Sequence, residues 1–147
     1  MQFCQEREIK LLPYGTLCGG LLSETYLGKP EPSGGMLNTT SLKKYKNMLN
    51  MWGSWSLFQE LLKTLKNIGD RHHVSISNIA VRYILDQPTV AGAIVGARLG
   101  LSEHLEENAQ VFSVMLDTTD MLEIDDVLKK SQDLFKIIGD CGDEYRR

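Results

Sequence analysis

A glycine-rich segment, Pro13–Gly20, follows the short apolar run Ile9–Leu12 and is the first part of the sequence that could do chemistry. Glycine-rich loops after strands allow backbone N–H groups to approach a phosphate closely. Neither common nucleotide motif is present: a P-loop starting at Gly15 would need a lysine after Gly20, where the sequence has Leu21, and no G-x-G-x-x-G occurs. The segment predicts a strand that ends in a tight loop.

The histidines and cysteines predict no metal site and no nucleophile. His72 and His73 are adjacent, so on a helix they point about 100° apart, and no cysteine or carboxylate lies at ligand spacing from them. Three cysteines without C-x-x-C spacing indicate reduced thiols rather than a disulfide framework or a zinc site. The scattered histidines and acids leave too many arrangements open to single out a Ser-His-Asp or Cys-His set.

Lysines and aromatic residues gather between residues 43 and 55. The lysines are Lys43, Lys44 and Lys46, and the aromatic residues are Tyr45, Trp52 and Trp55. They could form a nucleic-acid surface, or a solvated helix face with its aromatic residues in the core. The formal net charge of -3, from 16 basic and 19 acidic residues, favours the second interpretation.

The chain has 147 residues, 42% of them hydrophobic, which predicts one soluble domain covering residues 1–147. Its longest apolar run, Val90–Val95, contains Gly92, whereas about 18 apolar residues are needed to cross a bilayer. The first residues show neither a basic start followed by an apolar segment nor an Arg- and Ser-rich, acid-poor stretch. We therefore expect a cytoplasmic protein that binds neither a membrane nor nucleic acid.

The clearest helix begins near Trp55, where apolar residues recur at steps of three and four and predict one buried stripe. The stripe consists of Phe58, Leu61, Leu62, Leu65 and Ile68. Before this helix, segment 27–40 is rich in proline and glycine and is predicted to be a long surface loop, of the kind that serves as a lid or binding loop.

Polar residues at capping positions mark the expected starts of the other helices. Ser41 is expected to cap a helix through about Trp52, Ser77 a helix that Pro88 stops, Ser102 a short helix over 103–110, and Asp117 a long helix that continues to Ile138. The run Ala93–Ala97 is continuously apolar, which predicts a strand buried on both faces. Strands alternating with amphipathic helices indicate an α/β fold with parallel strands.

Two stretches resemble the aldo-keto reductases: Tyr14–Leu22, and Ala93–Arg98 followed by Glu103–Asn108. The first is similar to the family's aromatic-Ser-Pro-Leu-x-x-Gly-Leu-Leu at the end of its seventh barrel strand. The second is similar to the eighth strand and the cofactor-binding turn and helix after it. The resemblance covers nearly the whole chain and implies the carboxyl-terminal portion of a TIM (β/α)8 barrel with extra helices.

The resemblance also implies a site for NADP(H). Tyr14 would stack on the nicotinamide, the loop from Gly15 would lie under the pyrophosphate, Arg98 and His104 would meet the 2′-phosphate, and Glu107 with Asn108 would hold the adenine. The implied cofactor-binding residues are Tyr14, Gly15, Thr16, Leu17, Gly19, Gly20, Gly96, Ala97, Arg98, His104, Glu107 and Asn108. Gly15 and Thr16 depart from the usual Ser-Pro, and the turn after Ala97 is about one residue longer than in many members.

Elementary chemistry agrees with a phosphate site in the second stretch. Arg98 offers a planar fork of donors, and a helix starting at Ser102 would add free N–H groups and a partial positive charge. Loops after the seventh and eighth strands are the usual phosphate site of such a barrel. The alternative is that Arg98 is a surface charge and Asn108 a polar helix residue.

A complete barrel needs about 250 residues and eight strands, whereas this chain predicts two. No residue matches the family's Asp, Tyr, Lys and His catalytic motifs, so we name no catalytic residue. The resemblance implies the carboxyl-terminal part of an oxidoreductase that reduces a carbonyl by hydride transfer from NADPH and needs a missing amino-terminal half-barrel or self-association. The alternative is a non-catalytic interaction or regulatory protein of the same fold, like a potassium-channel β-subunit.

Overall fold

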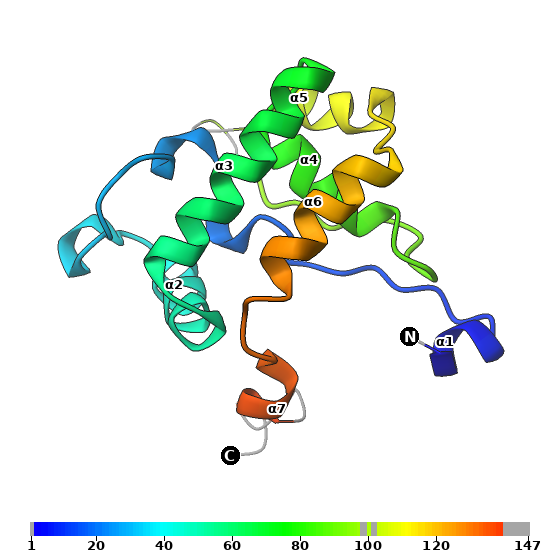
Figure 1. Cartoon of the computed structure of the whole chain (residues 1–147), viewed down its shortest axis with the longest axis horizontal. Helices are drawn as coiled ribbons and strands as arrows, with labels where there is room; N and C mark the ends of the chain where they lie inside the picture. Colours follow the sequence, from blue (N-terminus) through cyan, green and yellow to red (C-terminus); the bar gives the residue numbers. More distant parts are fainter. Residues whose placement is uncertain (1, 98–99, 101–102, 140–147) are drawn as a thin grey trace.

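A computed structural model describes residues 2–97, 100 and 103–139 of the chain. Figure 1 shows helix α3 at the centre with α4 and α6 beside it, while α1 lies at the far end of an extended segment. The α-helices are α1 (Gln2–Glu6), α2 (Thr40–Trp52), α3 (Trp55–His72), α4 (Ile76–Leu85), α5 (Leu105–Ala109), α6 (Thr118–Leu128) and α7 (Leu134–Ile138). Four 3-10 turns accompany them: η1 (Cys18–Gly20), η2 (Glu24–Tyr26), η3 (Gly34–Met36) and η4 (Gln110–Ser113).

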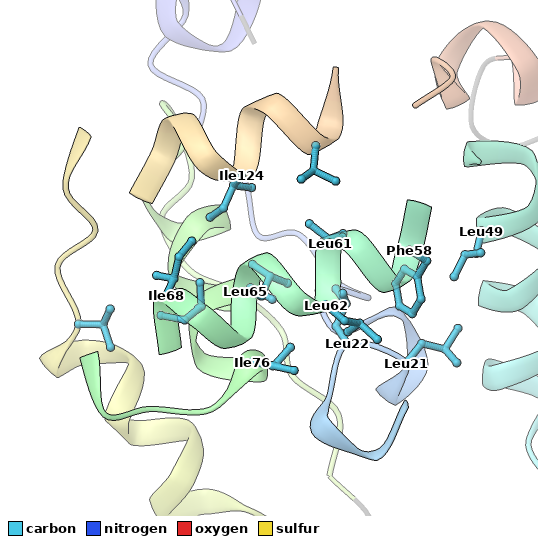
Figure 2. Close-up of a cluster of buried hydrophobic side chains, with 14 residues drawn as sticks. Leu21, Leu22, Leu49, Phe58, Leu61, Leu62, Leu65, Ile68, Ile76 and Ile124 are labelled. Atoms are coloured by element: carbon cyan, nitrogen blue, oxygen red, sulfur yellow. The ribbon is translucent and has the colours of Figure 1, made fainter. Parts of the chain in front are cut away.

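The predicted stripe of α3 forms the centre of the core (Figure 2). All five of its residues are buried, and Leu62 and Ile68 are completely so. Leu21 and Leu22 pack on it from the loop before α2, and Ile124 packs on it from α6. The prediction for this helix is confirmed, because every residue of its apolar stripe is buried against neighbouring elements.

Two of the predicted helix caps are wrong by two residues. The N-cap of α2 is Thr39 instead of Ser41, and its Oγ1 accepts a hydrogen bond from the N–H of Leu42 at 3.1 Å. The N-cap of α4 is Ser75 instead of Ser77. The Ser77 hydroxyl donates to the carbonyl of Leu22 and ties α4 to the loop before α2, a contact that no local sequence signal indicates.

The long carboxyl-terminal helix expected from Asp117 to Ile138 is two helices. Asp117 caps α6 as predicted, in a capping box with Asp120. The helix ends at Leu128, and Asp133 then accepts hydrogen bonds from two N–H groups at the start of α7. Aspartate side chains that bond nearby N–H groups favour a new helix start over continuation of the previous helix.

The long loop is held against α3 at its beginning. Gln59 accepts a hydrogen bond from the N–H of Gly28 at 2.7 Å and donates one to the carbonyl of Tyr26 at 2.9 Å. The indole N–H of Trp55 donates to the carbonyl of Lys29. These contacts argue against a lid hinged in this part of the loop.

Lys46 does not belong to a solvated helix face. Its ammonium group is buried, donates to Glu31 at 2.6 Å and to Asn50, and lies 5.8 Å from the centre of the Trp55 ring. A buried cation of this kind is stabilised by an anion and an aromatic face together. The favoured interpretation of these lysines as a solvated helix face is therefore wrong for Lys46.

Two extended segments run parallel and are joined by two isolated bridges. The bridges pair Leu11 with Val90 and Tyr14 with Ile94. The step between bridges is three residues on the first segment and four on the second. The second segment therefore carries one extra residue, as in a β-bulge.

Backbone hydrogen bonds hold this pair together. The N–H of Leu11 donates to the carbonyl of Thr89, the N–H of Ala91 to Leu11, and the N–H of Ile94 to Pro13, each at 2.9 Å. Pro13 has no N–H to donate, so the ladder is interrupted where the extra residue lies. This accounts for two bridges in place of a regular strand pair.

The strands predicted at Ile9–Leu12 and Ala93–Ala97 are present only as these paired segments. Their parallel direction agrees with the predicted α/β class, whereas the described residues do not confirm a partial barrel. The expectation of burial on both faces is wrong for the described part of the chain. Leu12, Tyr14 and Ile94 are 61%, 64% and 56% exposed, and we call these three residues the apolar strip.

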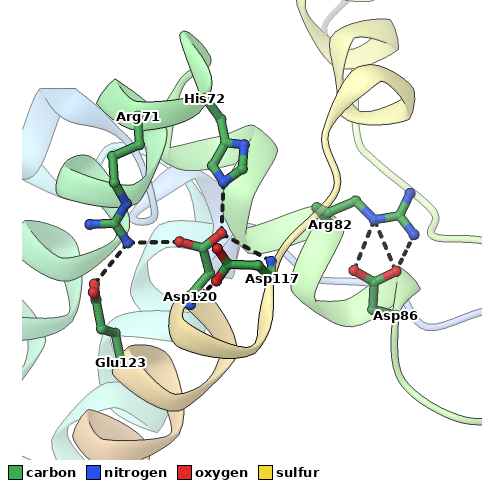
Figure 3. Close-up of polar contacts among 7 residues, drawn as sticks. All are labelled: Arg71, His72, Arg82, Asp86, Asp117, Asp120 and Glu123. Carbon is green, nitrogen blue, oxygen red and sulfur yellow. Dashed lines mark hydrogen bonds and ion pairs between the residues drawn. The ribbon is translucent and has the colours of Figure 1, made fainter.

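A polar cluster joins α3 to α6 (Figure 3). The buried Asp120 accepts hydrogen bonds from Arg71 and His72, both at 2.7 Å, and Arg71 also contacts Glu123 at 3.1 Å. Burial alone would raise the pKa of the Asp120 carboxyl, but the hydrogen bonds from Arg71 and His72 outweigh it, so this pKa lies below 3.8. No local sequence pattern indicates this cluster, because its halves are 48 or more residues apart.

We predict that Asp120→Ala lowers the free energy of unfolding by about 2–4 kcal/mol, because it leaves Arg71 and His72 without their shared partner. Asp126→Ala on the same helix is the control, since Asp126 pairs with Lys129 in solvent and its loss should leave the free energy of unfolding almost unchanged. Because the folded pKa of Asp120 is lowered, its contribution is complete above the unfolded value of about 3.9 and disappears as pH falls through the folded pKa. Urea unfolding between pH 7 and pH 2.5 measures both effects, and equal losses for the two variants would contradict the prediction.

Candidate cofactor-binding site

The loop that follows Tyr14 is a tight turn built on left-handed residues. Gly15, Cys18 and Gly19 have φ of 72°, 50° and 67°, and Gly20 has φ of 100°. The N–H of Cys18 donates to the carbonyl of Gly15 at 2.9 Å and closes the turn. Left-handed φ is the conformation for which glycine carries no steric penalty.

The loop rests on α2 and on the core. A Cβ atom at Gly19 would lie 2.9 Å from Oγ of Ser41, and one at Gly15 would lie 1.9 Å from the hydroxyl oxygen of Tyr45. Leu17 and Cys18 pack against the hydrophobic core. Helix α2 and the hydrophobic core therefore support the loop.

Two features of the loop fit a bound ligand. Oγ1 of Thr16 is buried without a hydrogen-bond partner in the structure, and buried hydroxyls normally have one. At Gly20 an added Cβ would meet no atom within 4 Å, so the backbone there faces open space. A loop with an unused polar group and an open backbone suits a polar ligand such as a dinucleotide.

The structure brings the first predicted stretch next to the beginning of the second. The bridge from Tyr14 to Ile94 places Gly96 and Ala97, which follow Ile94 closely, at the same end of the paired segments as the loop. The Tyr14 side chain is exposed, as a ring must be to stack on a ligand. Arg98 lies outside the residues that the structure describes.

The remaining predicted residues lie on α5, which packs against α4 and η4. His104 is its N-cap, with φ of 50°, and Nδ1 of His104 lies 3.0 Å from a carboxylate oxygen of Glu107. Asn108 is half-buried on the same helix. These three residues are thus together, and His104 pairs with Glu107 rather than pointing alone toward solvent.

The helix expected to start at Ser102 begins instead at Leu105 and has five residues. Ser102 itself lies outside the described residues. Aspartate, serine and threonine are good N-caps, whereas His104 makes no side-chain cap here. A helix this short has a weak dipole, so the predicted anion site at its start has little support.

Burial controls the chemistry of Cys18. It raises the pKa of the thiol to about 11, from an ordinary value of 9.0. Burial also raises the pKa of the neighbouring Tyr45 hydroxyl. Both groups are therefore neutral at pH 7, and Cys18 is a packing residue rather than a nucleophile.

Comparison with known proteins decides the family. The chain matches the aldo/keto reductase family over residues 1–129. It belongs to that family. The family accounts for the pairing of the Tyr14 loop with the segment around Ile94, because its members have a parallel barrel with cofactor loops at one end.

Two relatives of this aldo/keto reductase chain are much longer proteins. It is 34% identical over 88 residues to flagellar radial spoke protein 5 of Chlamydomonas reinhardtii, a match that covers 58% of this chain and 17% of the relative. It is 27% identical over 122 residues to an aryl-alcohol dehydrogenase of Pestalotiopsis microspora, covering 83% of this chain and 28% of the relative. The chain therefore spans less than a third of the length of either.

The described part of the chain lacks two kinds of feature. None of its helices is both long and apolar enough to span a membrane. Within the same residues, no three His, Cys, Asp or Glu side chains gather as a metal site would require.

We predict that Cys18 resists alkylation while Cys4 reacts. At pH 8 a thiol of pKa about 11 is about one part in a thousand thiolate, and the thiolate is the reactive form. The Cys18 rate should rise about tenfold per pH unit from pH 8 to pH 10. Iodoacetamide labelling with peptide mass mapping measures both sites, and equal rates at Cys4 and Cys18 would show that the loop does not bury its thiol.

Proposed function

We propose that this chain is the carboxyl-terminal part of an NADP(H)-dependent aldo-keto reductase and contributes the clamp for its cofactor. The observation that carries the proposal is the left-handed loop Gly15–Gly20 lying at one end of the Tyr14–Ile94 pair, in a chain of this family. The dinucleotide would lie across the ends of the two paired segments. The substrate would be a carbonyl compound, a class consistent with the aryl-alcohol dehydrogenase among its relatives.

Each predicted residue has a binding or orienting role in this proposal. Tyr14 would stack on the nicotinamide, and the backbone of the loop would face the pyrophosphate, with Oγ1 of Thr16 available as a hydrogen-bond donor. Bound NADPH would supply the hydride for reduction of the carbonyl. Because no described residue of the chain is assigned as a proton donor, we expect binding without turnover by the chain alone.

The second half of the clamp is less complete. Arg98 would provide the charged contact with the 2′-phosphate, which distinguishes NADPH from NADH. His104 is less well placed for this contact, because its Nδ1 lies 3.0 Å from a carboxylate oxygen of Glu107. The same carboxylate would repel a phosphate, so we assign the larger effect to Arg98.

The apolar strip is a surface that the remaining strands of a barrel would cover. Leu12 and Tyr14 are two residues apart on one extended segment, and Ile94 is opposite Tyr14, so the three side chains share a face. Leu12 and Tyr14 also line a shallow apolar pocket of about 400 Å³ with Ile84 and Val90. In a complete barrel such inward side chains are covered by those of the other strands. We propose that an amino-terminal half-barrel, or in its absence a second copy of this chain, covers the strip.

A non-catalytic role remains the second candidate. The similarity to a protein of the flagellar radial spoke favours it, because that name describes an assembly component rather than an enzyme. A binding or regulatory protein would keep the fold and could keep the dinucleotide, but would need no catalytic partner half. Carbonyl reduction by this chain together with an amino-terminal half-barrel would decide for the enzyme.

We predict that Arg98→Ala weakens NADPH binding about 10–150-fold and leaves NADH binding within about twofold, since a charge-assisted contact to phosphate contributes about 1.5–3 kcal/mol. Lys63→Ala, which removes an exposed cation on α3, is the control and should change neither affinity. Fluorescence titration with both dinucleotides measures the effect. A similar loss for both dinucleotides would remove Arg98 from the 2′-phosphate, and no binding of either by the folded chain would contradict the clamp.

We predict that the purified chain self-associates through the apolar strip. Leu12→Glu with Ile94→Glu should shift it toward monomer in sedimentation velocity without lowering its melting temperature, because both side chains are exposed. Phe112→Glu is the control, since Phe112 is 78% exposed and lies on η4, outside the strip. A wild-type chain that stays monomeric at high concentration and melts sharply would mean that the strip needs no cover.

A further inference from the structure

The ring of Tyr45 lies directly beneath the loop Gly15–Gly20. A Cβ atom built on Gly15 would be 1.9 Å from the Tyr45 hydroxyl oxygen and 2.7 Å from Cζ. One built on Gly19 would be 2.9 Å from Cδ2 of the same ring. One aromatic side chain therefore occupies the space next to both glycines, four residues apart.

Both glycines have left-handed φ, as does Cys18 between them. Non-glycine residues adopt this conformation at a cost of about 1–3 kcal/mol and keep it only where their surroundings enforce it. Cys18 is such a residue, and its side chain packs toward the core while the loop backbone lies on Tyr45. The ring is thus placed where it can enforce the turn.

The position of Tyr45 does not depend on the loop. Leu49, one turn of α2 further on, is buried in the core, and the adjacent Lys46 is held by Glu31 and Asn50. Tyr45 itself is half-buried and packs at the edge of the core. A helix anchored in the core thus presents the ring to a loop whose own hydrogen bonds, such as those from Cys18 to Gly15 and from Gly20 to Leu17, are short-range backbone bonds.

We propose that Tyr45 is the positioning residue of the cofactor loop: its ring holds Gly15–Gly20 in the left-handed turn that receives the pyrophosphate of the dinucleotide. That the ring holds the turn is inferred from geometry alone. That the turn receives the pyrophosphate rests on the proposed function. Tyr45 contacts the loop rather than the dinucleotide, so its effect on binding is indirect. It should act equally on NADPH and NADH, because both have the same pyrophosphate.

The first test separates the turn from the fold. Tyr45→Leu removes the ring. Tyr83→Leu is the control, because Tyr83 is a half-buried tyrosine of α4 that packs on the same core and is distant in sequence from the loop Gly15–Gly20. We expect both variants to melt at a lower temperature, but only Tyr45→Leu to raise the alkylation rate of Cys18, by about tenfold or more. Tyr45→Phe should leave that rate unchanged, because the ring remains. Equal Cys18 rates in Tyr45→Leu and Tyr83→Leu would overturn the proposal.

The second test uses the contact at Gly15. Gly15→Ala must displace the Tyr45 ring, whereas Gly20→Ala meets no atom within 4 Å and carries only the cost of its φ. In a double-mutant cycle, Gly15→Ala should destabilise the wild type more than the Tyr45→Leu protein, while Gly20→Ala should cost the same in both. Additivity at Gly15 would show that ring and loop are not coupled.

The third test concerns the ligand. If wild type binds NADPH and NADH, Tyr45→Leu should weaken both by the same factor of about ten, and Tyr83→Leu should change neither by more than about twofold. Unchanged affinities in a variant with an exposed Cys18 would overturn the role in binding. Failure of wild type to bind either dinucleotide would overturn the proposed function and with it this role, while the first two tests still decide whether Tyr45 holds the turn.

Discussion

Burial of the apolar stripe of α3 is the constraint on which the rest of the described structure depends. Helices α4 and α6 cover the stripe, and Leu21 and Leu22 reach it from directly after the loop Gly15–Gly20. A stripe of five large apolar residues stabilises the fold by several kcal/mol when covered and would drive aggregation when bare. The polar cluster at Asp120 fixes α6 on α3 in one arrangement, because a buried carboxylate must keep its partners. The loop Gly15–Gly20 is therefore held at one end by the core itself.

The two extended segments differ from the stripe of α3 because their apolar side chains are not buried. Within the part of the chain that the structure describes, none of their residues belongs to the buried core, although their sequence is as apolar as that of a barrel strand. Three backbone hydrogen bonds keep them parallel, and the apolar strip faces outward. The stripe of α3 is thus covered by neighbouring elements, while the apolar strip is not. This asymmetry is what a covering half-barrel or a second copy would correct.

Sequence reasoning succeeded where the signal is local and periodic. The α3 stripe and the Asp117 cap both follow from spacing along a few residues, and both are confirmed. It failed where long-range contacts choose between equivalent local options. Ser75 and Ser77 are both plausible caps, and the second is used to bind Leu22 across 55 residues. The continuous strand failed because Pro13 and the extra residue opposite it interrupt the ladder, which becomes visible only once the register is known.

The candidate site likewise contains parts that the sequence predicts and one part that it does not. The sequence pointed to the loop Gly15–Gly20 and to the segment at Gly96, and the structure brings these two together through the Tyr14–Ile94 bridge. Sequence reasoning does not single out Tyr45, which stands among lysines. Its signal is the pair Gly15 and Gly19, whose small size matters only when a bulky group lies against them.

The loop rests on α2 and on the hydrophobic core, whereas Tyr14, the residue proposed to stack on the nicotinamide, belongs to the exposed apolar strip. A dinucleotide would therefore find its pyrophosphate contacts formed in this chain and its nicotinamide contacts incomplete. An enzyme needs both ends of the cofactor fixed, because hydride transfer requires the ring to be positioned within a few tenths of an ångström. A regulatory protein needs only enough contacts to bind. The difference between the two functions thus lies in what covers the apolar strip, and the loop on α2 serves either one equally well.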